Sequence, residues 1–399
     1  MRFLFIGVYA EQSVVTKLNE LSQKEAYMSV AAIKYTRLIS EGFTHNVGEN
    51  CTNLFLVPVG MYPVCKIFYW NKTKIGNDYY IPFINFILIK QLSIMLYLFF
   101  FALKWYSKNT RNQKCCIVFS FLYPPFLLAI APLKVFKNIK TISFVPDMPE
   151  FAFSYSATKI SFKKFLIPVY IKISQKIVDL NDFYIFITKF MQTSFKNKPF
   201  LVIEGFTDAN LIANEQNLDK KQNAIMYSGA LFEKFGLRML LDAFCTLTGD
   251  YEMWLFGSGD MQDEIYKYII NDKRIKFFGN RPNAEVIEYQ KRASLLINPR
   301  FTSNTFTKYS FPSKLMEYMS TGTPVLTTRL AGIPDDYNDK MYYIEIETVD
   351  GFKESIIKCL SKPKQELKLF GENAKNYVLH KKNNFLQIRT LINQLKIKI

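Results

Sequence analysis

The chain has 399 residues, and 49% of them are hydrophobic, which is enough for two hydrophobic cores of ordinary domain size. The six cysteines show no CxxC spacing, which argues against a zinc site and a disulfide framework and favours a reducing compartment. The formal net charge of +17 is uneven, because residues 1–200 hold 24 Lys and Arg against 10 Asp and Glu. Nucleic acid, an anionic membrane and a phosphorylated substrate all remain candidate partners for this basic half.

The first half predicts strands at residues 2–6, 115–120 and 141–145, with long helices at 29–41 and 84–106 between them. The N-terminus has a short apolar run soon followed by Glu11, which is typical of a first strand rather than of a signal peptide.

Two stretches of the first half raise the question of a membrane. Residues 94–103 are all apolar, but a spanning helix needs about 20 such residues, so this stretch is too short unless Lys90 is buried. In residues 162–176, four lysines (Lys163, Lys164, Lys172 and Lys176) are interspersed among apolar side chains. Each stretch alone is typical of a core helix, but both lie in the basic half, and together they favour contact with a membrane surface.

The second half alternates strands and helices with more regularity. Strands are predicted at 224–228, 251–256, 275–278, 295–298, 325–328 and 341–346, and helices at 237–248, 261–270 and 284–292. This alternation predicts a parallel sheet in a Rossmann-like domain. Residues 205–222, rich in Asn, Asp and Gln, are the predicted linker, and apolar residues at helical spacing predict a last helix near the C-terminus.

The segment 309–328 carries most of the functional information. Pro312 favours a helix start, and Gly322 followed by Pro324 favours its end, so a helix of about nine residues is predicted. The backbone N–H groups and the dipole at such a start attract phosphate. Lys314 lies in the first turn and Glu317 one turn later on the same face. A cation for a diphosphate beside a carboxylate for sugar hydroxyls suits a nucleotide-sugar.

This segment resembles the donor-site signature of retaining glycosyltransferases of family four, which have the GT-B fold. Glu317 matches the second of two glutamates in that signature, which binds the nucleotide ribose in the family, whereas the first falls on Tyr309. The stretch 227–236 resembles the family loop that presents an arginine and a lysine to the donor diphosphate. Lys234 fits the lysine, and Ala230 replaces the arginine, so that Lys314 is the candidate for the missing charge.

The resemblance implies further site residues. Gly229, Gly257 and Gly259 end strands near the donor, and Ser313 lies in the first turn of the phosphate-binding helix. Arg300 follows a strand and is a candidate for a phosphate or acceptor contact, with an ordinary surface role equally open. In the first half, Asp147 follows a strand where relatives place a residue facing the donor sugar. Gly7 ends the first strand and is expected beside the diphosphate. The expected catalytic residues are Asp147, Lys234 and Glu317.

The implied fold is GT-B, with two α/β Rossmann-like domains facing each other across a cleft. We expect residues 1–205 to bind the acceptor and face the membrane, residues 206–380 to bind the nucleotide-sugar, and residues 381–399 to form a helix that packs back on the first domain.

The implied reaction moves a hexose-type sugar from a nucleotide diphosphate sugar to a polyprenyl-linked saccharide, with retention, in O-antigen or capsule assembly. We expect no metal and no cofactor besides the donor substrate, no nucleic-acid partner, and a place at the inner face of the bacterial plasma membrane on an anionic lipid surface. The alternative is a non-catalytic basic protein that binds membrane or nucleic acid and has a degenerate, inactive GT-B cleft; the departures at Tyr309 and Ala230 keep it open.

Overall fold

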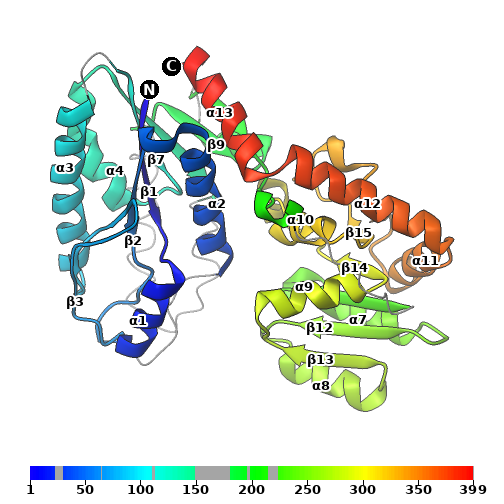
Figure 1. Ribbon diagram of the computed structural model, residues 1–399. Helices are drawn as coiled ribbons and strands as arrows, with labels where there is room; N and C mark the ends of the chain where they lie inside the picture. The colour runs from blue at the N-terminus through cyan, green and yellow to red at the C-terminus, as the bar shows by residue number, and fades with distance from the viewer. Residues whose placement is uncertain are drawn as a thin grey trace. The chain divides into compact units, whose positions relative to one another are not determined.

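The computed structural model describes residues 1–22, 30–63, 65–109, 113–148, 180–195, 198–213 and 223–398. The chain divides into two compact units, Met1–Glu204 with Asn384–Ile399, and Gly205–Asn383. Each unit is an α/β structure built on a parallel sheet (Figure 1). The stretch 162–176 and the second half of the linker, residues 214–222, lie outside the described residues.

The sheet of the first unit has eight strands in the order β10-β9-β8-β7-β1-β2-β5-β4. Every neighbouring pair is parallel except β4 with β5. The strands are β1 (Arg2–Val8), β2 (Cys51–Leu56), β4 (Thr73–Ile75), β5 (Asp78–Tyr80), β7 (Cys115–Phe119), β8 (Ile139–Val145), β9 (Phe183–Phe186) and β10 (Phe200–Val202). The near-continuous apolar runs of β1, β7 and β9 are typical of parallel strands that are buried on both faces.

Helices cover both faces of this sheet, with α3 and α4 on one face and α2 on the other (Figure 1). The helices are α1 (Gln12–Ser22), α2 (Val30–Val47), α3 (Ile89–Asn109), α4 (Pro124–Ile130) and α13 (Asn384–Lys398). The last helix packs on α2, where Asn384 Nδ2 donates to the Leu38 carbonyl at 3.0 Å and the His45 and Phe385 rings stack at 3.8 Å.

The predicted helix at 84–106 was wrong at its start. Residues 83–84 form strand β6 (Phe83–Ile84), which pairs antiparallel with β3 (Tyr69–Trp70), and the helix begins only at Ile89. The buried Asn85 explains the later start of the helix. Its Nδ2 atom donates to the carbonyls of Gly60 and Ile67, and these bonds hold Asn85 in the loop before the helix. Lys90 is buried in the same region, at 6% exposure. Within the described ranges, no helix has the length and apolar content needed to cross a membrane.

The second unit confirms the predicted alternation. Its sheet has the order β13-β12-β11-β14-β15-β16, and all its strand pairs are parallel. The strands are β11 (Ala224–Ser228), β12 (Glu252–Phe256), β13 (Ile275–Gly279), β14 (Leu295–Asn298), β15 (Val325–Thr328) and β16 (Tyr342–Ile344). The helices are α7 (Leu237–Cys245), α8 (Gln262–Asn271), α9 (Asn283–Arg292), α10 (Ser313–Ser320), α11 (Val349–Leu360) and α12 (Lys364–Lys381).

Candidate active site

The strand order of the second unit fixes where a ligand is expected. Relative to their order in the sequence, the strands are arranged 3-2-1-4-5-6, so the direction of winding reverses between β11 and β14. Ligands of such sheets bind outside the carboxyl ends of the strands at this reversal. The backbone pairing of β11 with β14 extends only from Ile225 with Leu295 to Met226 with Leu296. Beyond this pair, the end of β11 at Ser228 contacts side chains from α9 and α10 instead.

Helix α10 begins immediately after Pro312, and no side chain caps its N-terminus. One face of the helix is buried through Leu315, Met316, Tyr318 and Met319. The spacing of these residues leaves Lys314 and Glu317 together beside the buried face. The helix thus presents its uncapped N-terminal turn, a lysine and a glutamate in one place.

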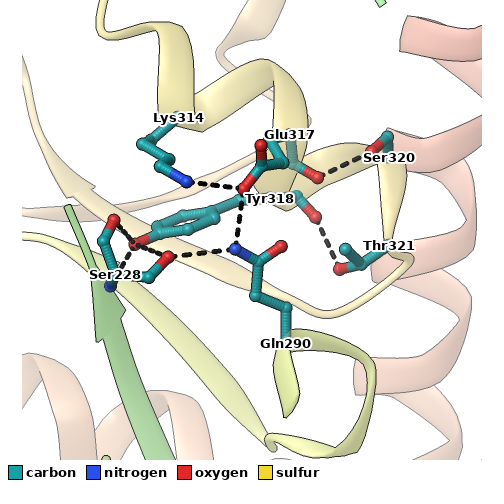
Figure 2. A network of polar contacts seen from close by, with 7 residues as sticks. All are labelled: Ser228, Gln290, Lys314, Glu317, Tyr318, Ser320 and Thr321. Carbon is teal, nitrogen blue, oxygen red and sulfur yellow. Dashed lines mark hydrogen bonds and ion pairs between the residues drawn. The ribbon is translucent and has the colours of Figure 1, made fainter. Parts of the chain in front are cut away.

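Glu317 is held by two donors (Figure 2). Its Oε1 atom accepts from Lys314 Nζ at 2.7 Å and from Gln290 Nε2 at 2.9 Å. The Glu317 side chain is only 10% exposed, whereas the Lys314 side chain is 36% exposed. The same Gln290 nitrogen donates to Ser228 Oγ at 3.0 Å, so the fully buried Gln290 links the end of β11 to the carboxylate on α10. Charged hydrogen bonds in such a shielded place are stronger than neutral ones.

Tyr318 fixes the other side of the network (Figure 2). Its hydroxyl accepts from the Ser228 backbone N–H at 2.8 Å and donates to the Ser228 carbonyl at 3.0 Å. Burial raises the pKa of Tyr318 well above its ordinary value, so the hydroxyl keeps its proton at neutral pH and can donate. A side chain therefore satisfies backbone groups that a neighbouring strand would otherwise pair.

Two further cations lie near the loop that follows β11. The Lys234 Nζ atom is 5.5 Å from the centre of the Phe235 ring, and the Arg300 Cζ atom is 4.5 Å from the same centre. Asn304 Nδ2 donates to the Lys234 carbonyl at 3.1 Å, and Thr328 Oγ1 donates to the Arg300 carbonyl. The fold thus brings together two of the predicted donor-binding residues, which lie 66 positions apart in the sequence.

The predicted glycines at the strand ends have a packing role that the sequence alone did not reveal. Gly257 has a φ of +126°, and a Cβ there would lie 1.9 Å from the carbonyl oxygen of Gly229. A Cβ at Gly259 would lie 2.2 Å from the Leu231 carbonyl oxygen. Only glycine permits this approach of the two loops, which hydrogen bonds join from Gly229 N to Phe256 O and from Leu231 N to Ser258 O.

The predicted residues of the first unit lie at the carboxyl ends of its strands. Asp147 is exposed just after β8, and its charge adds to the effect of burial in raising the pKa of Tyr35. Gly7 is buried in β1, where a Cβ would lie 2.6 Å from Thr36 Cγ2 and 2.8 Å from Ser120 Oγ. The close packing around Gly7 is therefore enough to require a glycine at this position, independently of any contact with a diphosphate.

The sequence reasoning missed three members of the network, namely Ser228, Gln290 and Tyr318. Gln290 offered a signal, because it falls four residues after Val286 on the buried side of the predicted helix, where an amide requires a polar partner. In the described part of the chain, His, Cys, Asp and Glu do not gather in any group of three that could hold a metal ion.

Residues 208–377 match the family model described as glycosyl transferases group 1, and this match contains the whole network. The match lies within the second unit and spans less than half of the chain, so it shows that this unit is similar to the group 1 glycosyl transferases.

Solved structures identify the fold of the whole chain as GT-B, as the sequence predicted. HepE of Anabaena, crystallised with UDP, is 14% identical with a TM-score of 0.62, and the comparison covers 100% of both chains. Sucrose-phosphate synthase of Thermosynechococcus elongatus is 12% identical with a TM-score of 0.66, again over 100% of both chains. The galactosyltransferase WaaB of the lipopolysaccharide outer core is 14% identical with a TM-score of 0.62 and the same coverage.

One curated relative shares sequence with part of this chain. It is the amylovoran biosynthesis glycosyltransferase AmsK of Erwinia amylovora, 28% identical over 117 residues. The matched stretch is 28% of this chain and 29% of AmsK, so the similarity spans less than a third of that relative.

Proposed function

We propose that this chain is a group 1 glycosyl transferase that moves a hexose-type sugar from a nucleotide diphosphate sugar to a polyprenyl-linked saccharide, in O-antigen or capsule assembly. Three neighbours support the proposal. HepE has been crystallised with UDP-glucose, AmsK takes part in amylovoran biosynthesis, and WaaB is a galactosyltransferase of the lipopolysaccharide outer core.

The observation that carries the proposal is the pairing of Lys314 and Glu317 at the start of α10, beside the reversal of strand order. A carboxylate that is held by Gln290 and Lys314 is positioned to accept hydrogen bonds from sugar hydroxyls. The positive end of the α10 dipole favours a diphosphate in the same place. Lys314 thus has two proposed roles. Its ammonium group meets the charge of the diphosphate, and it also holds the Glu317 carboxylate through their ion pair.

The family resemblance implies retention at the anomeric carbon, and we propose a reaction on one face of the donor sugar. The bond from the anomeric carbon to the diphosphate oxygen breaks while a bond from that carbon to the acceptor oxygen forms. The acceptor hydroxyl gives its proton to the departing diphosphate. The growing charge on the diphosphate is met by Lys234, Lys314 and the N-terminus of α10. Asp147 is the proposed group facing the donor sugar, and Arg300 a proposed phosphate or acceptor contact.

We further propose that the enzyme acts at the inner face of the bacterial plasma membrane, where a polyprenyl-linked acceptor is held. This proposed location is supported by the excess of 14 positive charges in residues 1–200, because positive charge attracts anionic lipid.

The proposed function is tested by thermal stabilisation with a panel of nucleotide diphosphate sugars. A ligand that binds only the folded protein raises its unfolding temperature by mass action, so we expect one donor to raise it clearly more than its nucleoside diphosphate alone. If no member of the panel raises it, the chain is the non-catalytic alternative.

A further inference from the structure

The outer face of α3 is apolar along most of its length. The helix buries Ile94, Leu98, Ala102 and Trp105 in the first unit. On the opposite face, four large apolar side chains are about half exposed or more, namely Ile89 at 47%, Leu92 at 56%, Leu96 at 53% and Phe100 at 63%. Their spacing of three and four residues places them on one stripe. Figure 1 shows this helix as an outer layer over the sheet of the first unit.

The stripe continues into the short ribbon formed by β3 and β6. Tyr69 and Ile84 are direct cross-strand partners, and both are exposed, at 49% and 39%. The exposed Phe68 packs edge-on against Phe86 at 4.7 Å between ring centres, and the Ile84 backbone N–H donates to Ser93 Oγ of α3 at 3.3 Å. We call these exposed side chains and the α3 stripe the apolar face. Soluble proteins rarely expose a continuous apolar surface of this kind without a partner.

The turn between the ribbon and α3 adds an independent observation. Leu88 has a φ of +65° and is 79% exposed. A leucine rarely adopts this left-handed conformation, and here it gains no burial within the chain in return. The backbone thus holds a large apolar side chain outward at a conformational cost.

The charge around the apolar face selects its partner. Residues 57–114 contain eight Lys and Arg, of which Lys90 is buried, but only one acidic residue, Asp78, which accepts a hydrogen bond from Asn53 Nδ2 at 2.9 Å. Lys104 and Lys108 are exposed on α3 itself. Two copies of such a surface would repel each other, whereas an anionic surface would attract it. An apolar helix face with flanking lysines matches the boundary between lipid headgroups and acyl chains.

We propose that the apolar face enters the headgroup boundary of an anionic bilayer and holds the first unit on the membrane. This inference gives a specific site to the membrane attachment of the proposed function and rests on that function only for its biological setting. Membrane binding then has two contributions, insertion of apolar side chains and attraction between charges. Salt screens the attraction between charges, whereas apolar insertion persists at high salt.

The test is flotation of the full chain with phosphatidylcholine vesicles, with and without phosphatidylglycerol. The apolar variant is Leu96→Glu with Phe100→Glu, and the charge variant is Lys104→Gln with Lys108→Gln. The matched control is Tyr266→Glu with Ile270→Glu on α8, which are 55% and 70% exposed at the same spacing. All four substituted apolar side chains are exposed, so we expect every variant to melt near the wild-type temperature.

We expect the wild type to float with anionic vesicles and to keep part of its binding at about 1 M salt, where charges act over only about 3 Å. The charge variant should bind less at low salt only. The apolar variant should lose at least about tenfold in partitioning at both salt concentrations, because each glutamate replaces an apolar side chain that, in the proposal, leaves water for the bilayer. The control should bind like the wild type.

The proposal is overturned if the apolar variant floats like the wild type, or if the control loses as much vesicle binding as the apolar variant. It is also overturned if the wild type does not float with either kind of vesicle. It is also overturned if the apolar variant abolishes a concentration-dependent dimer in sedimentation while vesicle binding is absent. Flotation needs no donor, so donor binding by the same preparations separates the two proposals. Flotation without donor binding removes the proposed function alone.

Discussion

Gln290 Nε2 donates to Glu317 Oε1 at 2.9 Å, although the two residues lie 27 positions apart on different helices. Because the same nitrogen reaches Ser228 Oγ at 3.0 Å, the position of the carboxylate is tied to the central strand of the sheet. The buried Gln290 amide therefore fixes the position of the Glu317 carboxylate in the candidate site, and Gln290 is a positioning residue.

Replacing Gln290 by leucine should weaken donor binding by about tenfold, because Ser228 and Glu317 lose a donor in a shielded place, at a cost of about 1–3 kcal/mol. Titration calorimetry with the donor found by thermal screening measures the affinity. Gln365→Leu, at an exposed position on α12, is the control. A lower unfolding temperature with unchanged donor affinity would show that Gln290 only supports the fold.

Replacing Gly257 by alanine should destabilise the second unit by at least about 3 kcal/mol, since it adds a backbone clash to a strained φ. Gly279→Ala is the matched variant, because Gly279 also has a positive φ, of +69°, but a Cβ there meets nothing within 4 Å. That variant should cost about 1–2 kcal/mol. Chemical denaturation measures both, and equal losses would contradict the packing role of Gly257.

The buried Lys90 predicts a pH dependence of stability. Burial lowers the pKa of Lys90 from 10.5 to about 8, although its Nζ donates to the Val59 carbonyl at 2.9 Å. Between these values, the unfolded chain binds more protons than the folded one, so the free energy of unfolding rises with pH. Below pH 8 the burial of the charge costs about 3 kcal/mol, at 1.36 kcal/mol per pKa unit.

Lys90→Met removes this cost. The variant should exceed the wild type in stability most at pH 7 to 8, as the pKa of about 8 implies, and this advantage should shrink towards pH 10.5. Denaturation of both proteins across this range gives the difference. An advantage that is independent of pH would show that Lys90 does not titrate in this way.

Sugar transfer should survive EDTA, since the proposed mechanism meets the diphosphate charge with Lys234, Lys314 and a helix terminus rather than with a metal. The activity assay is run with EDTA and then with added manganese. Loss of transfer in EDTA with recovery in manganese would contradict this mechanism.

The second unit could be predicted well from sequence because its elements are encoded locally. The strands 224–228, 295–298 and 325–328 have the predicted bounds, since short apolar runs end at glycine or polar residues. The pairing of Lys314 with Glu317 follows from helical spacing. The role of Gln290 was not predictable in this way, because it depends on how α9 and α10 pack.

The first unit was less predictable for a related reason. Strands β4 and β5 have only three residues each, and β3 and β6 only two each, so local pattern is weak and tertiary pairing decides. The apolar residues 94–103 were taken as too short to span a membrane unless Lys90 is buried. Lys90 is buried, but no described helix is long and apolar enough to cross a membrane. The sequence left open which residues of this stretch are buried. Packing of α3 on α4 and the sheet buries Ile94 and Leu98 and leaves Leu96 and Phe100 outside.

The most direct measurement is donor affinity in Glu317→Ala, Lys314→Ala and the double variant, with Lys362→Ala and Glu366→Ala as controls from a separate ion pair of the second unit. Each single variant at the site should weaken binding at least tenfold, since charged hydrogen bonds in a shielded place contribute about 1.5–3 kcal/mol. The double variant should lose less than the sum of the two, because the residues are in contact. Wild-type affinity in correctly folded Glu317→Ala and Lys314→Ala would contradict the placement of the donor at α10.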